Sequence, residues 1–245
     1  SAMRLLAQAL AFDIVGRSAI VSDPDWQGGN YYGTDRSPEK GLSLARKLGH
    51  ITYLSPEMME IKFGREKKER AEKTVDTGAN RFVTDFQVES YLNHQGKKFT
   101  GRFDANSYLH ITRAIDEYDL CDRVSSSCDV LKSIKAKTLI VALSSDWLVT
   151  PEQSQEIANG LLEARRGVSY CELQAPHGHD AFLVDIQHLG DVIRAFLPWV
   201  DGGRALVKGG VSNFKEREYF TIAGLVEPES SVLDFGCGDG TLLDR

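Results

Sequence analysis

The feature that most constrains this 245-residue chain is the alternation of strand and helix patterns after residue 127. In order, the patterns are a short helix at 129–134, an apolar strand at 137–143 (KTLIVAL), a helix at 151–162, a second strand at 168–173 and a helix at 186–199. Strands that alternate with helices of this length predict a parallel sheet. This part of the chain is therefore assigned to the α/β class.

The part of the chain before this sheet is predicted to be helical. Helix patterns lie at 4–22, 41–61, 65–75, 84–94 and 104–116, with a loop rich in Gly, Tyr and Asp at 25–40. Several helices with no strand between them predict an inserted helical lid. The alternating charges of 65–73 (REKKERAEK) are typical of a solvated helix face. Because no helix start signal precedes the first pattern, we expect the chain to begin inside a longer protein.

The composition argues against several classes of protein. The net charge is −6 and the Lys and Arg residues are scattered, so no nucleic-acid partner is expected. The four cysteines show no CxxC pair and no His spacing of a zinc site, which predicts neither a metal site nor a disulfide framework. The chain has no apolar run of about 20 residues and no signal pattern, so we expect no membrane span and a cytoplasmic location.

Two loops that follow the predicted strands carry titratable side chains. They are 144–151 (SSDWLVTP) and 176–182 (PHGHDAF), and strand-end loops carry the chemistry in doubly wound α/β proteins. An acid followed by a histidine is the order found in α/β-hydrolases. Asp146 would then orient the imidazole of His179, which would accept a proton from a hydroxyl. Taken alone, Asp146 is more often a helix cap or turn former, and a loop histidine is more often structural.

A serine nucleophile for such a site is not evident in the sequence. The chain has no G-x-S-x-G motif. The nearest segment, 41–45 (GLSLA), lies in a helix pattern with no strand before it, so it is not expected to form a nucleophile elbow. We therefore expect an elbow serine, if one exists, to precede residue 1.

Five stretches in order resemble the homoserine O-acyltransferases of methionine biosynthesis, which are usually acetyltransferases. The stretches are 11–32, 41–55, 103–120, 145–154 and 176–183. The resemblance covers about residues 1–200. It implies the C-terminal part of an α/β-hydrolase fold with a helical lid over about 25–120, and a homodimer.

The resemblance also implies a reaction and its site residues. A serine takes acetyl from acetyl-CoA, and His179, oriented by Asp146, deprotonates the hydroxyl of L-homoserine without a cofactor or metal. Arg46 resembles the residue that binds the substrate carboxylate, and Asp180 the one that binds its amino group. Tyr53, on about the same helix face as Arg46, could line the pocket. Structural roles remain open: an ion pair for Arg46, a turn cap for Asp180 and a core position for Tyr53. Without the serine, we expect the isolated chain to have no transferase activity.

The C-terminal segment resembles the start of another domain. A Gly-rich linker at 201–211 precedes a helix pattern at 213–225 and a strand pattern at 231–235, followed by glycines. The sequence VLDFGCGDG resembles motif I of S-adenosylmethionine-dependent methyltransferases, so 212–245 is expected to begin a Rossmann-like methyltransferase-like domain. Only the complete domain would bind S-adenosylmethionine. The glycines expected to contact it are Gly236, Gly238 and Gly240.

Other functions remain open at this stage. The same fold could serve a homoserine O-succinyltransferase, a serine O-acyltransferase, or an esterase that uses water as the acceptor. Arg46 and Asp180 lying together with His179 would favour an amino-acid acceptor. A different class of protein is an inert dimerisation module built on helices at 41–116. Helices that pack outward with an exposed apolar face, and a distance from Asp146 to His179 too long for a hydrogen bond, would favour that module.

Overall fold

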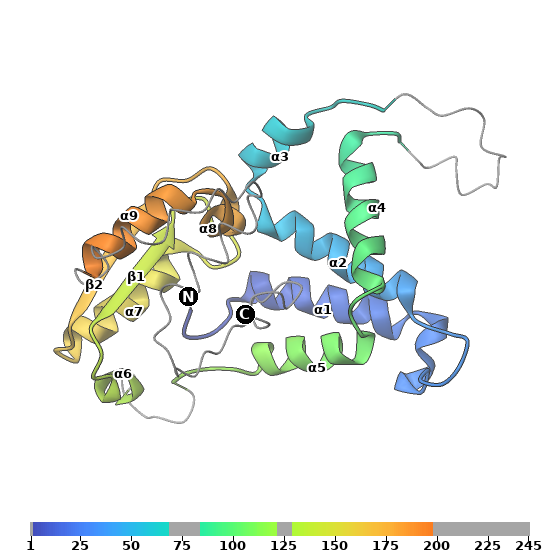
Figure 1. The fold of residues 1–245 in the computed structure, drawn as a ribbon. Coiled ribbons are helices and arrows are strands. Elements are labelled where there is room, and N and C mark those ends of the chain that lie inside the picture. The colour runs from blue at the N-terminus through green and yellow to red at the C-terminus, as the bar shows by residue number, and fades with distance from the viewer. Residues whose placement is uncertain (1, 69–83, 122–128, 198–245) are drawn as a thin grey trace, which may run out of the picture. The chain divides into compact units, whose positions relative to one another are not determined.

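The computed structural model describes residues 2–68, 84–121 and 129–197 (Figure 1). The chain divides into two compact units, Ser1–Asp185 and Ile186–Arg245. The elements of the first unit are α1 (Ala7–Val21), η1 (Pro24–Gly29), α2 (Glu39–Tyr53), α3 (Pro56–Phe63), α4 (Gln87–Thr100), α5 (Ala105–Asp116), α6 (Asp129–Ser133), β1 (Thr138–Leu143), α7 (Pro151–Glu163), β2 (Val168–Leu173), η3 (Gly178–Asp180) and α8 (Ala181–Val184). The described part of the second unit contains α9 (Ile186–Phe196).

The small sheet consists of β1 and β2, which pair in parallel from Thr138 opposite Val168 to Leu143 opposite Leu173. Helix α7 connects the two strands and packs against both. A cluster of buried side chains lies beneath them, namely Met3, Leu131, Ile140, Ala158 and Leu161. The predicted parallel pairing is confirmed, and both strands end at the same edge of the sheet.

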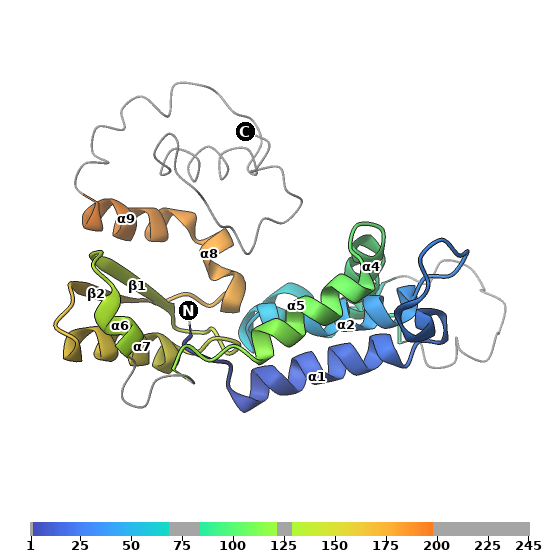
Figure 2. The same cartoon turned by 90° about the horizontal axis from the view of Figure 1, so that it is seen from below.

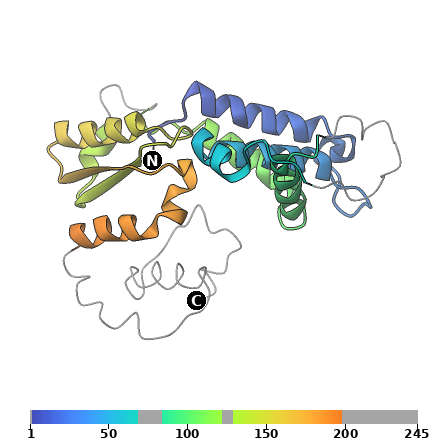
Figure 3. The ribbon, with the colours of Figure 1, turned by 90° about the horizontal axis from the view of Figure 1, so that it is seen from above.

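The helical part of the first unit is built around α1 and α2. Helix α1 packs against α2 and α5, and α2 also packs against α4 (Figures 2 and 3). Gly41 permits the close approach of α1 and α2, because a Cβ there would lie 2.5 Å from the carbonyl oxygen of Ala19. The core of this part contains Ile20, Tyr31, Leu42, Ala45, Phe99 and Ala105. The first helix is therefore packed together with the helices predicted as a lid.

One predicted helix, at 41–61, is wrong, because the chain forms α2 and α3 with a break between them. Leu54 is extended, with φ −100° and ψ 146°. The Ser55 hydroxyl then accepts a hydrogen bond from the N–H of Met58 at 3.0 Å, and Pro56 is the first residue of α3. A serine cap followed by proline is a strong helix start, so the break has a local cause.

The helix predicted at 65–75 is also wrong where it can be examined. Lys67 forms an isolated antiparallel bridge with Phe86 instead of continuing a helix. The rest of that range, the predicted linker at 201–211 and the predicted domain at 212–245 lie outside the described residues, as do Gly236, Gly238 and Gly240. Cys121 is disulfide-bonded, whereas the sequence predicted no disulfide framework, and Cys171 is free. No described helix is long and apolar enough to cross a membrane.

Candidate active site

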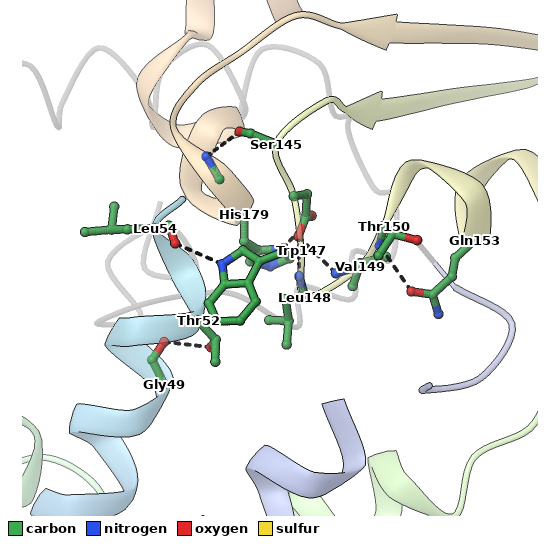
Figure 4. A network of polar contacts seen from close by, with 12 residues as sticks. Gly49, Thr52, Leu54, Ser145, Trp147, Leu148, Val149, Thr150, Gln153 and His179 are labelled. Atoms are coloured by element: carbon green, nitrogen blue, oxygen red, sulfur yellow. Dashed lines mark hydrogen bonds and ion pairs between the residues drawn. The ribbon is translucent and has the colours of Figure 1, made fainter. Parts of the chain in front are cut away.

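The centre of the candidate site is the contact between Asp146 and His179, the second of which is labelled in Figure 4. Oδ2 of Asp146 lies 2.9 Å from Nδ1 of His179. Asp146 is buried, and its Oδ1 accepts hydrogen bonds from the N–H groups of Leu148 at 3.0 Å and Val149 at 2.9 Å. The His179 side chain is 31% exposed. A carboxylate held in this way keeps Nδ1 protonated and leaves Nε2 as a base.

The parallel sheet explains why these two side chains meet. Asp146 follows β1 and His179 follows β2, and the last paired residues are Leu143 and Leu173. One more backbone bond continues the pairing, from the N–H of Ser144 to the carbonyl of Leu173 at 2.9 Å. Both loops therefore leave the same edge of the sheet side by side. A separation too long for a hydrogen bond, expected for an inert module, is not observed.

The other predicted site residues lie beside this pair. The rings of Tyr53 and His179 are 6.0 Å apart between centroids. The guanidinium carbon of Arg46 lies 5.5 Å from the centre of the Tyr53 ring and 4.6 Å from that of Phe99. Asp180 directly follows His179 in η3. Helix α2, which packs against η3, therefore supplies Tyr53 and Arg46 next to His179.

The charge of Arg46 acts on the pKa of Asp180, although the two side chains form no ion pair. Burial raises the pKa of Asp180, and the neighbouring charges of His179 and Arg46 oppose that rise. Burial likewise raises the pKa of Tyr53, and Arg46 and Asp180 act on it in opposite directions. Within the described residues, neither Arg46 nor Asp180 forms an ion pair. Arg46, which hydrogen-bonds the Tyr53 side chain, and Asp180 thus place a cation and a carboxylate near His179 without an ion pair between described residues.

The structure also brings in His50, which the sequence did not indicate. Nδ1 of His50 lies 3.0 Å from the hydroxyl of Tyr91, and its ring packs edge-on against Tyr53. Burial, followed by the positive charges of Arg46 and Lys62, lowers the pKa of His50 to about 4. This histidine is therefore neutral near pH 7. Its spacing from Arg46 on α2 is the only sequence signal that could have pointed to it.

A second set of contacts joins the two loops to the end of α2. The indole N–H of Trp147 donates to the carbonyl of Leu54 at 2.9 Å (Figure 4). The Trp147 ring also packs edge-on against Phe12. Ser55 donates to the carbonyl of Pro176. Sequence reasoning missed these residues because each partner lies far away along the chain.

Other potential binding features lie elsewhere in the described chain. A cavity of about 710 Å³ between α1, η1 and α5 is lined by Arg17, Trp26 and Asn106, among others, and by none of the predicted site residues. Among the described residues, no group of three or more His, Cys, Asp or Glu side chains is placed to hold a metal ion.

The arrangement of sheet, strand-end loops and Asp–His pair matches part of the α/β-hydrolase fold. The homoserine O-acetyltransferase from Bacillus anthracis matches the fold with a TM-score of 0.69 at 21% identity, over 80% of this chain and 51% of that one. Esterase E22 matches with a TM-score of 0.66 at 23% identity, over 80% of this chain and 52% of that one. At these identities the two structures show the fold alone.

Sequence similarity is more specific, although no family model matches the chain. The chain is 49% identical over 191 residues to a homoserine O-acetyltransferase of Methanobrevibacter ruminantium, covering 78% of this chain and 38% of that protein. It is 47% identical over 197 residues to a homoserine O-succinyltransferase of Burkholderia thailandensis, covering 80% and 51%. Over about 80% of its length this chain is thus similar to homoserine O-acyltransferases, and it spans about half or less of these relatives. The two names leave the acyl group undecided, and neither is that of a methyltransferase.

Proposed function

We propose that this chain is the part of a homoserine O-acetyltransferase that carries the general base and the acceptor pocket. The observation that carries the proposal is the 2.9 Å contact between Asp146 and His179, next to Arg46 and Asp180, which form no ion pair with described residues. A base alone would serve many reactions. A base beside a separate cation and anion suits an acceptor that is itself a zwitterion with a hydroxyl group.

The proposed reaction has two halves. First, Nε2 of His179 accepts the proton of a serine hydroxyl, not assigned to any residue of this chain, while the serine oxygen attacks the thioester of acetyl-CoA; the C–S bond breaks, and His179 passes the proton to the departing CoA thiolate. In the second half, Nε2 of His179 accepts the proton of the L-homoserine hydroxyl while its oxygen attacks the acyl carbonyl. The bond to serine then breaks, and His179 returns the proton to the serine oxygen. Asp146 holds Nδ1–H throughout and stabilises the imidazolium.

The acceptor would be oriented by its two charged groups. Arg46 is proposed to bind the homoserine carboxylate, and Asp180 its ammonium group. Burial raises the pKa of Asp180, so an ammonium placed against it would favour its ionised form. Tyr53, between Arg46 and His179, would line the pocket.

Several parts of the proposal rest on the motif resemblance alone. These are the acetyl donor, a homodimer, a cytoplasmic location, and an acyltransferase that uses no cofactor or metal. The methyltransferase-like segment at 212–245 is proposed on its VLDFGCGDG motif, with Gly236, Gly238 and Gly240 contacting S-adenosylmethionine in a complete domain.

The test begins with the complete reading frame that contains this chain. An in-frame G-x-S-x-G motif before Ser1 is expected, and its absence would contradict the proposed acyl-serine. The protein encoded by the whole frame is then assayed for CoA release and for O-acylhomoserine. Faster reaction with succinyl-CoA than with acetyl-CoA would assign the succinyl activity, whereas acetate release that does not require homoserine would indicate an esterase.

Variants of the site residues separate their roles. Asp146→Asn and His179→Gln are expected to lower kcat by roughly 10³- to 10⁴-fold, as for other triad members. Arg46→Met is expected to raise the KM for homoserine by about 10- to 100-fold, because a charged contact is lost. Lys47→Met, which removes the neighbouring cation bonded to Asn93, is the matched control and should leave KM unchanged. Equal effects of the two cation variants would refute the acceptor role of Arg46.

A further inference from the structure

The hydroxyl of Ser145 joins the two loops of the candidate site. Ser145 directly precedes Asp146, and its hydroxyl donates to the carbonyl of Ala175. The same oxygen accepts a hydrogen bond from the N–H of Gly178 at 2.8 Å (Figure 4). Gly178 directly precedes His179. One side chain therefore connects the residue before the acid to the residue before the base.

The histidine loop is held from its other side by the end of α2. Gly178 has φ +76°, and a Cβ on it would lie 2.4 Å from the N atom of Ser55 and 2.7 Å from the carbonyl carbon of Leu54. Ser55 in turn donates to the carbonyl of Pro176. The peptide before His179 thus lies between Ser145 and the backbone of residues 54 and 55.

Besides this packing and the ring contacts of His179 with Tyr53 and Phe182, few contacts of the described residues position His179 relative to Asp146. The backbone pairing of β1 and β2 ends at the bond from Ser144 to Leu173, so the residues that follow have no sheet partner to fix them. The imidazole is partly exposed, and its hydrogen bond within the described chain is to Asp146. A displacement of about 1 Å is enough to cost a catalytic group about 100-fold in rate.

We propose that Ser145 is a positioning residue for the base. By binding the N–H of Gly178 and the carbonyl of Ala175, its hydroxyl places Nδ1 of His179 against Oδ2 of Asp146. Ser145 need not touch a substrate. The kinetic part of this inference rests on the proposed function, because a shift of His179 changes the rate of acyl transfer only if His179 is the base.

The neighbouring serine supplies a matched control. The hydroxyl of Ser144 also bonds to the histidine loop, accepting from the N–H of Ala175 at 3.0 Å, but the N–H of Gly178 donates to Ser145 and not to Ser144. Ser144→Ala and Ser145→Ala each remove one hydroxyl that reaches Ala175. Only Ser145→Ala removes the acceptor of the Gly178 N–H, one residue before His179.

The first measurement is proton NMR of the 245-residue chain, which needs no activity. The strongly deshielded Nδ1 proton of His179, assigned by its loss in His179→Gln, is expected in wild type and in Ser144→Ala. It is expected to broaden or vanish in Ser145→Ala. Ser145→Thr keeps the hydroxyl and should keep the signal, whereas Ser145→Val has nearly the same shape and should lose it. An unchanged signal in Ser145→Val would overturn the proposal, and so would loss of the signal from both the Thr and the Val variant.

The second measurement is steady-state kinetics of the protein from the complete reading frame. Ser145→Val is expected to lower kcat by about 10- to 100-fold while the KM for homoserine stays within about twofold, since the acceptor contacts are intact. Ser145→Thr should retain most of kcat. Retention of acyl transfer by His179→Gln would refute the proposed function, whereas equal kcat in the Thr and Val variants would refute only the role of Ser145.

Discussion

Replacing Gly178 by alanine tests how closely the histidine loop is packed against the end of α2. Gly178 has φ +76°, and an added Cβ would lie 2.4 Å from the N atom of Ser55, 2.7 Å from the carbonyl carbon of Leu54 and 2.9 Å from the carbonyl oxygen of Tyr53. All three atoms belong to the backbone. No side-chain rotation can therefore relieve the contact, and the loop itself has to move.

The expected cost has two parts. A side chain in the left-handed region costs about 1–2 kcal/mol. Forcing an extra methyl group into a packed site costs about 1–3 kcal/mol more, which makes a total of about 2–5 kcal/mol for Gly178→Ala. Gly33 supplies the control, because it has φ +73° and nothing within 4 Å of an added Cβ. Gly33→Ala should therefore carry only the cost of a side chain in the left-handed region, about 1–2 kcal/mol.

The assay is thermal unfolding of the two variants beside the wild type. At about 2–4 °C per kcal/mol for a unit of this size, Gly33→Ala should lower Tm by about 2–8 °C and Gly178→Ala by about 4–20 °C. The deshielded proton of His179 should persist in the first variant and disappear in the second. Equal Tm values for the two variants, with the proton signal kept in both, would refute the close packing of Gly178.

Three further predictions concern single side chains. Trp147→Phe removes the hydrogen bond to the carbonyl of Leu54 and should lower the free energy of unfolding by about 0.5–1.5 kcal/mol, measured by urea denaturation, and an unchanged midpoint would contradict it. Burial and then the hydrogen bond to Asp116 raise the pKa of Asp13 from 3.8 to about 7, so folding favours its protonated form. Stability should therefore fall as pH rises from about 4 to 7. Asp13→Asn should flatten this part of the curve of Tm against pH, and a slope like that of wild type would count against it. The pKa of His50, lowered to about 4, predicts that its NMR signals do not titrate near pH 6.5, and a transition there would show that it is not desolvated.

The local pattern of the chain determined the sheet and the meeting of its two loops. The apolar run of β1, the helix α7 and the strand β2 were all predicted, and parallel pairing follows from their order. Parallel strands end at a common edge, so residues just beyond them must lie near each other. Asp146 and His179 are therefore expected to lie near each other. In the structure Nδ1 of His179 and Oδ2 of Asp146 are 2.9 Å apart.

Helix boundaries followed local rules only in part. The Ser55-Pro56 start of α3 is written in the sequence, yet the helical periodicity continued across it and hid the break. The charged segment that begins at Arg65 resembles a helix in its pattern, but Lys67 pairs with Phe86 instead. A bridge between residues this far apart in the sequence depends on the tertiary fold, and helical periodicity carries no information about it.

The sequence by itself therefore determined the order of elements, the parallel pairing and the proximity of the acid to the base. Only the tertiary structure decided what surrounds them. The hydroxyl of Ser145 meets Gly178 across 33 residues, and the indole of Trp147 meets Leu54 across 93. Such contacts form because packed helices and loops bring distant backbone groups within hydrogen-bond reach, and no local pattern of residue types encodes which groups those will be.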